Sequence, residues 1–174
     1  MVVSLVAAAL AAGALMSSAP ESLDPQLEVF RPFLGKTWKG TFANSTPEKP
    51  MIDVARYERA MNGKAVRVMH SVNNGDYGGE TLIFWNAEAK KIGYFYLTTA
   101  GFRTEGFLTP EKDGFSALEE VKGNANGITQ VRSTSKMTGP GKYKVVAEYL
   151  QDGKWVPGRE TDYVEDSKAK IVFK

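Results

Sequence analysis

The chain has 174 residues, a length that suits one domain, and its 22 Lys and Arg against 20 Asp and Glu give a formal net charge of +2. It has no cysteine and one histidine, which excludes disulfides, thiolate metal sites, cysteine nucleophiles and metal sites with several histidines. The charges are interspersed without a basic block, so we expect no nucleic-acid partner. Nine Phe, seven Tyr, three Trp and 17 Gly favour many short strands joined by tight turns.

The first segment, residues 1–19, is typical of a secretory signal peptide. Its run MVVSLVAAALAAGALM is apolar and shorter than the about 20 residues that a membrane-spanning helix needs. Cleavage after Ala19, with Ser17 two residues before it, fits the small-residue rule, while cleavage after Ala14 and an uncleaved anchor are the alternatives. We therefore expect a periplasmic or secreted protein without stable membrane insertion, in which residues 20–174 form a single domain.

A short helix is expected directly after this segment. Asp24 is a good N-cap and Pro25 a good first helical residue, and Gly35 suits the end of the helix. Apolar residues follow at helical spacing, at Leu27, Phe30 and Leu34.

After the helix the hydrophobic pattern changes to a period of two, which indicates β-strands. The predicted strands are Thr37–Ala43, Met51–Met61, Lys64–Val72, Glu80–Trp85, Ile92–Thr99, Phe102–Thr109, Phe115–Val121, Ile128–Met137, Lys142–Leu150 and Lys154–Val164. Short turns separate them, among them Asn62-Gly63, Asp113-Gly114, Asn126-Gly127 and Asp152-Gly153. About ten consecutive antiparallel strands leave two exposed edges unless the sheet closes, so we predict an all-β, closed, up-and-down barrel, with a β-sandwich as the alternative.

The hairpin around Asn62-Gly63 can be aligned residue by residue if these two residues form the turn. The facing pairs on one side are then Ala55 with His70, Tyr57 with Val68, and Arg59 with Val66. This is the more apolar side, so it should face the interior and carry Arg59 and His70 inward. On the other side we expect a cross-strand ion pair between Glu58 and Arg67. An inward Arg or His needs a carboxylate, a water network or a ligand as its partner.

The stretch FLGKTWKGTF, residues 33–42, resembles the first-strand signature of the calycin superfamily, with one residue more between the first glycine and the tryptophan than usual. In these lipocalin-like barrels that tryptophan, here Trp38, closes one end of the barrel under the N-terminal helix. Two further stretches, ARYERAMNGKAVRVMH and LIFWNAEAKKIGYFYLTTAG, resemble a group of bacterial lipocalin-like proteins, although Trp85-Asn86 replaces the usual Tyr-Asp of that group. The resemblance covers residues 24–165 and implies a fold but no activity.

A related ten-stranded group, the nitrobindins, binds haem through a histidine near the C-terminus of the domain. The last strands of this sequence, YKVVAEYLQDGKWVPGRETDYV, contain no histidine. We therefore carry no haem ligand over to this chain and expect no cofactor and no metal.

Three functions remain open at this stage. The first is binding of a small hydrophobic or amphipathic ligand inside the barrel, by residues chosen from the inward-facing and aromatic positions: Tyr57, Arg59, His70, Tyr94 and Tyr96. The second is a structural or interaction protein of the cell envelope with a filled barrel, in which His70 is a satisfied core residue, Arg59 pairs with Asp53 and the tyrosines only pack.

The third is an isomerase or hydrolase acting on a lipid-like substrate, with His70 paired to Tyr57 or Glu105 as acid and base. The sequence has no GxSxG motif, so it favours a protein that is not an enzyme. The ligand and the oligomeric state do not follow from the sequence.

Overall fold

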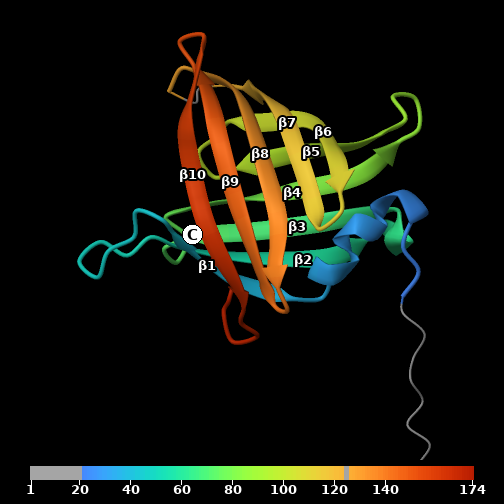
Figure 1. Ribbon diagram of the computed structural model, residues 1–174, viewed down its shortest axis with the longest axis horizontal. Helices are drawn as coiled ribbons and strands as arrows, with labels where there is room; N and C mark the ends of the chain where they lie inside the picture. The colour runs from blue at the N-terminus through green and yellow to red at the C-terminus, as the bar shows by residue number, and fades with distance from the viewer. Residues whose placement is uncertain (1–20, 124–125) are drawn as a thin grey trace, which may run out of the picture.

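The protein, described here from a computed structural model, is a closed antiparallel barrel. The structure describes residues 21–123 and 126–174, so the predicted signal peptide lies outside the described residues. In this part of the chain each of ten strands pairs with its sequence neighbours, and the last strand pairs with the first (Figure 1). The strands are β1 (Thr37–Phe42), β2 (Ile52–Ala60), β3 (Ala65–Val72), β4 (Tyr77–Asn86), β5 (Lys91–Thr98), β6 (Arg103–Glu111), β7 (Gly114–Lys122), β8 (Ile128–Gly139), β9 (Lys142–Gln151) and β10 (Lys154–Glu165). The predicted fold class is confirmed.

The N-terminal helix, η1 (Pro25–Phe33), is a 3₁₀-helix rather than an α-helix. Asp24 caps it as predicted, because its carboxylate accepts a hydrogen bond of 3.1 Å from the Gln26 amide. A 3₁₀-helix has three residues per turn, so its buried face repeats every third residue, at Leu27, Phe30 and Phe33. Leu34, the third residue of the predicted helical spacing, follows the helix as its C-cap and is partly buried against the core.

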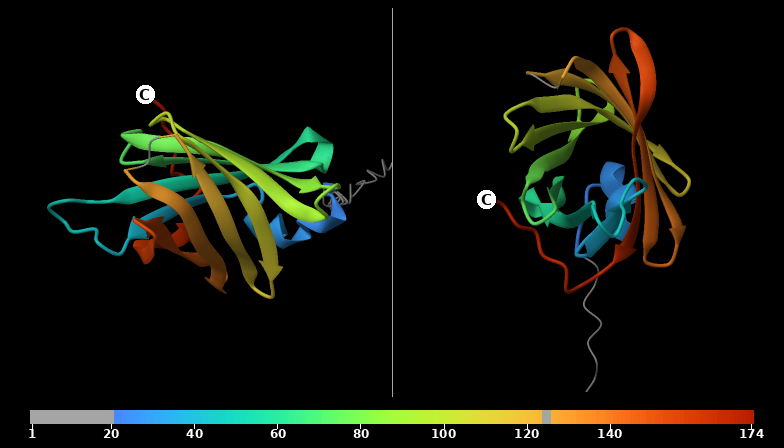
Figure 2. Two further views of the ribbon diagram at one scale, coloured as in Figure 1. Left: turned by 90° about the horizontal axis from the view of Figure 1, so that it is seen from above. Right: turned by 90° about the vertical axis from the view of Figure 1, so that its left-hand side faces the viewer.

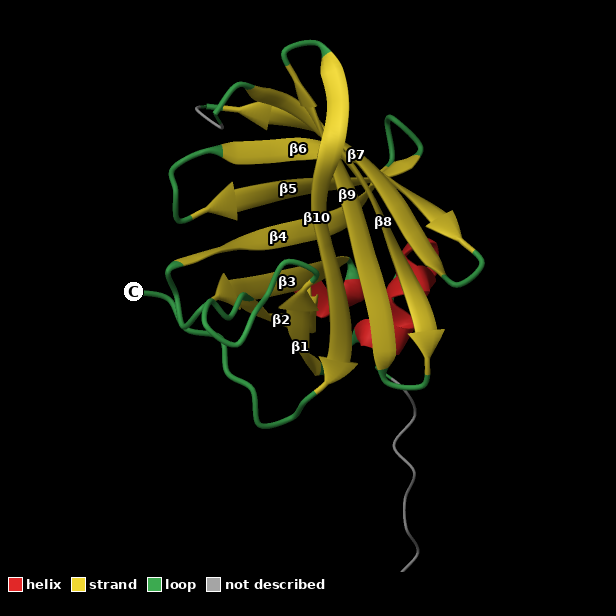
Figure 3. Cartoon of the chain, turned by 60° about the vertical axis from the view of Figure 1, so that its left-hand side comes forward, coloured by secondary structure: helices red, strands yellow, loops and turns green. Residues whose placement is uncertain are grey.

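Helix η1 lies against one end of the barrel (Figures 2 and 3). Its buried Phe30 and Phe33 rings fill this end together with aromatic rings of the strands. Trp38 is fully buried there, with ring centroids 5.9 Å from Phe33 and 4.9 Å from Tyr143. The indole nitrogen donates a 3.5 Å hydrogen bond to the Phe33 carbonyl. This packing closes the barrel under the helix, as the resemblance of the first strand implied.

The β2–β3 hairpin has the register that the sequence predicts, with Tyr57 opposite Val68 and Ala55 opposite His70. Its turn is longer than predicted: Met61–Gly63 forms a short 3₁₀ segment, η2, and all three of these residues have positive φ. The turn before β7 also differs, because Gly114 is already paired with Glu111 and leaves Lys112 and Asp113 as the turn.

The predicted ion pair between Glu58 and Arg67 does not form at contact distance. Glu58 instead accepts from Arg56 at 2.7 Å, and Arg67 pairs with Glu80 of the next strand at 2.6 Å. Both arrangements lie on the outside of the barrel, where ion pairs contribute little to stability.

The C-terminal segment after β10, residues 166–174, runs along the outside of the barrel without forming a strand. The Val172 amide donates to the Ser71 hydroxyl at 3.0 Å, and Lys174 pairs with Asp76 at 2.7 Å. Among the described residues, no helix is both long enough and apolar enough to cross a membrane.

Candidate functional site

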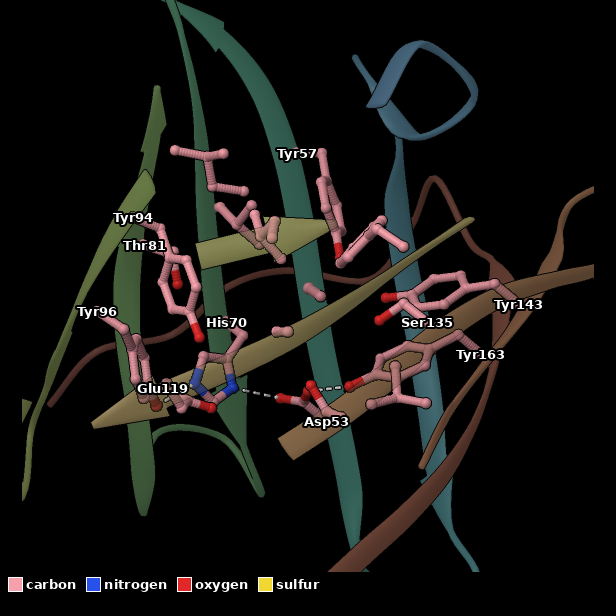
Figure 4. Close-up of a pocket in the computed structure, with 18 of the residues that line it drawn as sticks. Asp53, Tyr57, His70, Thr81, Tyr94, Tyr96, Glu119, Ser135, Tyr143 and Tyr163 are labelled. Carbon is pink, nitrogen blue, oxygen red and sulfur yellow. Dashed lines mark hydrogen bonds and ion pairs between the residues drawn. The ribbon is translucent and has the colours of Figure 1, made fainter. Parts of the chain in front are cut away.

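The barrel encloses a cavity of about 150 Å³ that is lined by side chains from every strand except β1. Because strand residues alternate between inside and outside, every second residue of a strand contributes to this lining. The apolar lining comes mainly from positions near η1, namely Tyr57, Ile83, Leu108, Phe115 and Val145. The polar lining further from η1 includes Asp53, His70, Tyr96, Glu119 and Tyr163 (Figure 4). Arg159 belongs to the same lining.

A chain of hydrogen bonds connects the polar residues on one side of the cavity. The Tyr163 hydroxyl donates to Asp53 Oδ2 at 2.5 Å, and Asp53 Oδ1 lies 3.0 Å from His70 Nδ1 (Figure 4). His70 Nε2 lies 2.7 Å from the Tyr96 hydroxyl, which is 2.7 Å from the Tyr77 hydroxyl. An ionised carboxylate only accepts, so Nδ1 carries the proton toward Asp53, and the hydrogen bond between Nε2 and the Tyr96 hydroxyl completes the chain.

Asp53 is the buried anion of this chain, with only 1% of its surface exposed. Burial alone would raise its pKa. The hydrogen bond and charge of His70, followed by the charge of Arg159 and the hydrogen bond from Tyr163, outweigh burial, so the pKa of Asp53 is lowered. The carboxylate therefore stays ionised.

Glu119 is a second carboxyl group in the same cavity, and its pKa is shifted in the opposite direction. It accepts a short hydrogen bond from the Thr104 hydroxyl, but burial dominates and raises its pKa. The neighbouring Tyr94 hydroxyl is buried and has no hydrogen-bond partner among the described residues. Burial first, and then the charge of Glu119, raise the pKa of Tyr94, so its phenol stays neutral and can donate a hydrogen bond.

The five residues predicted to bind a ligand lie in two places. Tyr57, His70, Tyr94 and Tyr96 all line the cavity. Arg59 does not: it donates to the Ser22 carbonyl at 2.5 Å and lies 3.9 Å from Glu21, beyond the closed end of the barrel. Arg59 therefore pairs with an acidic residue as expected, but this residue is Glu21 rather than Asp53, because His70 and Tyr163 occupy the Asp53 carboxylate.

The acid–base pair of His70 with Glu105 is also not formed. Glu105 is paired in register with Phe95 and alternates with the inward-facing Thr104, so it lies on the outer side of β6. Both ring nitrogens of His70 are occupied by Asp53 and Tyr96 instead.

The carboxyl groups and the arginine of the cavity were missed as site residues: Asp53, Glu119 and Arg159. Alternation along the last predicted strand could have found Arg159, because it has the same parity as Tyr163 and Thr161, both of which are buried. The same alternation places Asp53 inward with Tyr57 on β2, and Glu119 inward with Phe115 on β7.

Haem does not fit this interior. The cavity of about 150 Å³ is far smaller than a haem group, and the only histidine of the chain already uses both ring nitrogens in hydrogen bonds. Among the residues that the structure describes, no group of three or more His, Cys, Asp or Glu side chains could hold a metal ion.

No family model matches this sequence, and no curated protein matches it either. Among solved structures, the crystal structure of Rv2717c from M. tuberculosis superposes with a TM-score of 0.62. The similarity covers 83% of this chain and 99% of that chain, at 10% sequence identity, so it concerns the fold alone.

Proposed function

We propose that this calycin-like barrel binds a small amphipathic molecule in its interior. The observation that carries the proposal is the two-sided lining of the cavity, apolar near η1 and polar further from it. The Tyr94 hydroxyl adds to it, because a buried hydroxyl without a partner costs free energy that a ligand or water can recover. Such a lining suits a molecule with one apolar part and one polar group.

The size of the cavity limits the ligand. Pockets for drug-sized molecules have volumes of about 300–1,000 Å³. A dry cavity of about 150 Å³, engineered into another protein, binds benzene. The cavity here has about that volume, so we propose a ligand with a single ring or a short chain. The same volume argues against a completely filled barrel, the structural alternative.

Titration of the ¹⁵N-labelled protein, followed by NMR, tests this function. The probes are benzyl alcohol, hexan-1-ol, benzoate and hexanoate, each added up to about 10 mM, which populates complexes of millimolar Kd. We expect saturable shifts of the amides of cavity residues such as Ile83, Leu108 and Val145. If none of the four compounds shifts these amides, the function proposed here is wrong.

A cavity-filling variant provides the control. Ala117 lines the cavity, and Ala117→Leu adds three carbon atoms to its wall. We expect this variant to abolish binding while the protein remains folded. The matched control is Leu118→Ala on the adjacent residue, whose side chain is 53% exposed on the outside and should leave binding unchanged.

Export to the periplasm or the medium is part of the same proposal. It rests on the apolar composition of residues 1–19, and N-terminal sequencing of the protein recovered from cells checks it. Removal of this segment during export would support the predicted location.

A further inference from the structure

Arg159 enters the cavity beside an irregularity in β10. Pro157 is paired with Glu148 and Glu160 with Val146, so three steps on β10 match two steps on β9. Gly158 and Arg159 therefore face the single residue Ala147, which is the definition of a β-bulge. Bulges of this kind are frequent beside active sites, where they direct a side chain.

Gly158 makes this close approach of the two strands possible. A Cβ atom at that position would lie 2.8 Å from the Ala147 carbonyl oxygen and 2.8 Å from the Tyr149 ring, which is too close for either contact. Pro157 fits the same place, because a proline within a sheet is confined to edges and bulges. The local sequence thus favours a backbone that presents Arg159 to the cavity.

The guanidinium of Arg159 has no hydrogen-bond or ion-pair partner among the described residues. In residues 21–123 and 126–174 no oxygen atom accepts a hydrogen bond from it, and no carboxylate lies within ion-pair distance. The nearby Asp53 carboxylate is already held by His70 and Tyr163. By contrast, Arg132 on the outside of the barrel pairs with Glu148 at 2.6 Å.

Arg159 is half-buried, and its guanidinium carries five N–H donors that no acceptor of the described residues occupies, so they are left for water or a ligand. The group nevertheless stays charged. Burial works against its charged form, but Tyr163 and Asp53 outweigh burial, so the pKa of Arg159 is raised. A permanent cation with free donors inside a ligand-sized cavity is suited to receive an anion.

We infer that the ligand of this barrel is a small organic carboxylate whose head group is bound by the guanidinium of Arg159. This inference rests on the proposed function and names the chemical class of its ligand. The planar fork of arginine matches the two oxygen atoms of a carboxylate. The Tyr94 hydroxyl, which lies beside Glu119 and has no partner at hydrogen-bonding distance among the described residues, is a second possible donor in the same cavity.

The charges of the cavity favour a monoanion over a dianion. Arg159 is its permanent cation, and Asp53 and Glu119 are its carboxyl groups. A dianion such as phosphate would add two negative charges beside the ionised Asp53. A single carboxylate adds one, and the raised pKa of Glu119 makes this neighbouring side chain easier to protonate when the carboxylate binds.

The experiment compares each acid with the alcohol of the same skeleton: benzoate with benzyl alcohol, and hexanoate with hexan-1-ol. The NMR titration at neutral pH is run on the wild type, Arg159→Gln, Arg159→Lys and Arg132→Gln. In the wild type we expect each acid to bind at least about tenfold more tightly than its alcohol. Arg159→Gln should bind each acid no more tightly than its alcohol. Its affinity for the alcohols should be unchanged, and this unchanged affinity would also show that the variant is folded.

The other variants separate charge from structure. Arg159→Lys keeps the positive charge but loses the planar fork of donors, so it should retain part of the preference for acids over alcohols. Arg132→Gln changes an arginine on the outside of the barrel and should retain the full preference. The acid-to-alcohol ratio of the wild type needs no variant, so the inference can be tested even if Arg159→Gln does not fold.

Three results would overturn the inference while leaving the proposed function intact. They are equal binding of acids and alcohols by the wild type, an unchanged ratio in Arg159→Gln, and tighter binding of inorganic phosphate than of hexanoate. Failure of all four organic compounds to bind would overturn both the inference and the proposed function.

Discussion

Two carboxyl groups in one cavity have pKa values shifted in opposite directions. Asp53 is ionised because His70, Arg159 and Tyr163 outweigh its burial. Glu119 has a raised pKa because burial dominates over the hydrogen bond from Thr104. Groups separated in this way can play different parts, one as a fixed anion and the other as a neutral hydrogen-bonding acid.

The raised pKa of Glu119 predicts how the stability of the protein depends on pH. The folded state holds this proton more tightly than the unfolded chain, whose carboxyl has its ordinary pKa of 4.5. The stabilisation is fully present below about pH 4.5 and is lost as the pH rises through the folded-state pKa. We expect Glu119→Gln, which cannot ionise, to escape this loss, so the stability of the variant relative to wild type should increase with pH.

Urea unfolding of both proteins between about pH 4 and pH 8 measures this difference. Asp53→Asn provides the contrast, because the lowered pKa of Asp53 places its contribution to the pH dependence below 3.8. A stability difference between Glu119→Gln and the wild type that stays constant over the range would show that Glu119 has an ordinary pKa.

Residue positions could be predicted wherever strict alternation holds and two strands are joined by a short turn. Tyr57 and His70 follow from the β2–β3 register, which the structure confirms. Arg59 has the same parity, yet it lies outside the cavity, because the interior near η1 ends before this residue and Ser22 lies beside it. The point along β2 at which the barrel interior ends depends on how η1 packs against the barrel. The alternation of residues along one strand carries no information about this packing.

At the scale of elements, the second glycine of FLGKTWKGTF has a role that its strand alone does not reveal. Gly40 is paired with Asp53 on one side and Tyr163 on the other. A Cβ atom at Gly40 would lie 2.5 Å from the Tyr163 ring. Glycine at this position therefore allows the ring to lie against β1 while its hydroxyl donates to Asp53.

We expect Gly40→Ala to displace the Tyr163 ring and leave one Asp53 oxygen without its donor. The loss of a buried hydrogen bond to a charged group predicts a decrease of about 1–3 kcal/mol in the free energy of unfolding, measured with urea. Gly139→Ala is the control, because Gly139 also lies in a strand but a Cβ atom there meets nothing within 4 Å. Equal stability of the two variants would contradict this role of Gly40.

Elements were easier to predict than the contacts between them. All ten strands are present, because Gly, Asn and Asp residues with positive φ, such as Asp152-Gly153, mark the turns. The predicted ion pair of Glu58 with Arg67 was wrong, because Arg67 has an acidic neighbour on each adjacent strand, Glu58 on β2 and Glu80 on β4. The alignment of the β2–β3 hairpin alone reveals only Glu58. The choice of Glu80 requires the position of β4, which the closed sheet determines.

At the scale of the whole molecule, the interior of the barrel has two parts. Aromatic rings pack tightly at the end under η1, and polar side chains line the cavity further from it. Phe33 of η1 lies at the centre of the packed end, with ring centroids 5.1 Å from Tyr57, 5.8 Å from Phe115 and 5.2 Å from Tyr143. These three partners also line the cavity, so the packed end forms the apolar wall of the proposed site. Arg159 and Asp53 line the part of the interior that lies further from η1.

This division predicts that stability and ligand selectivity can be separated. Phe33→Ala removes a fully buried ring and should lower the free energy of unfolding by about 3–5 kcal/mol. Phe95→Ala, which truncates a ring that is 47% exposed on the outside, should cost much less. At a temperature where the Phe33 variant is folded, its preference for hexanoate over hexan-1-ol should match that of the wild type, because distant sites contribute independently. Loss of the preference in this variant would mean that the packing of η1 also positions the polar groups, and that the two parts of the interior act as one.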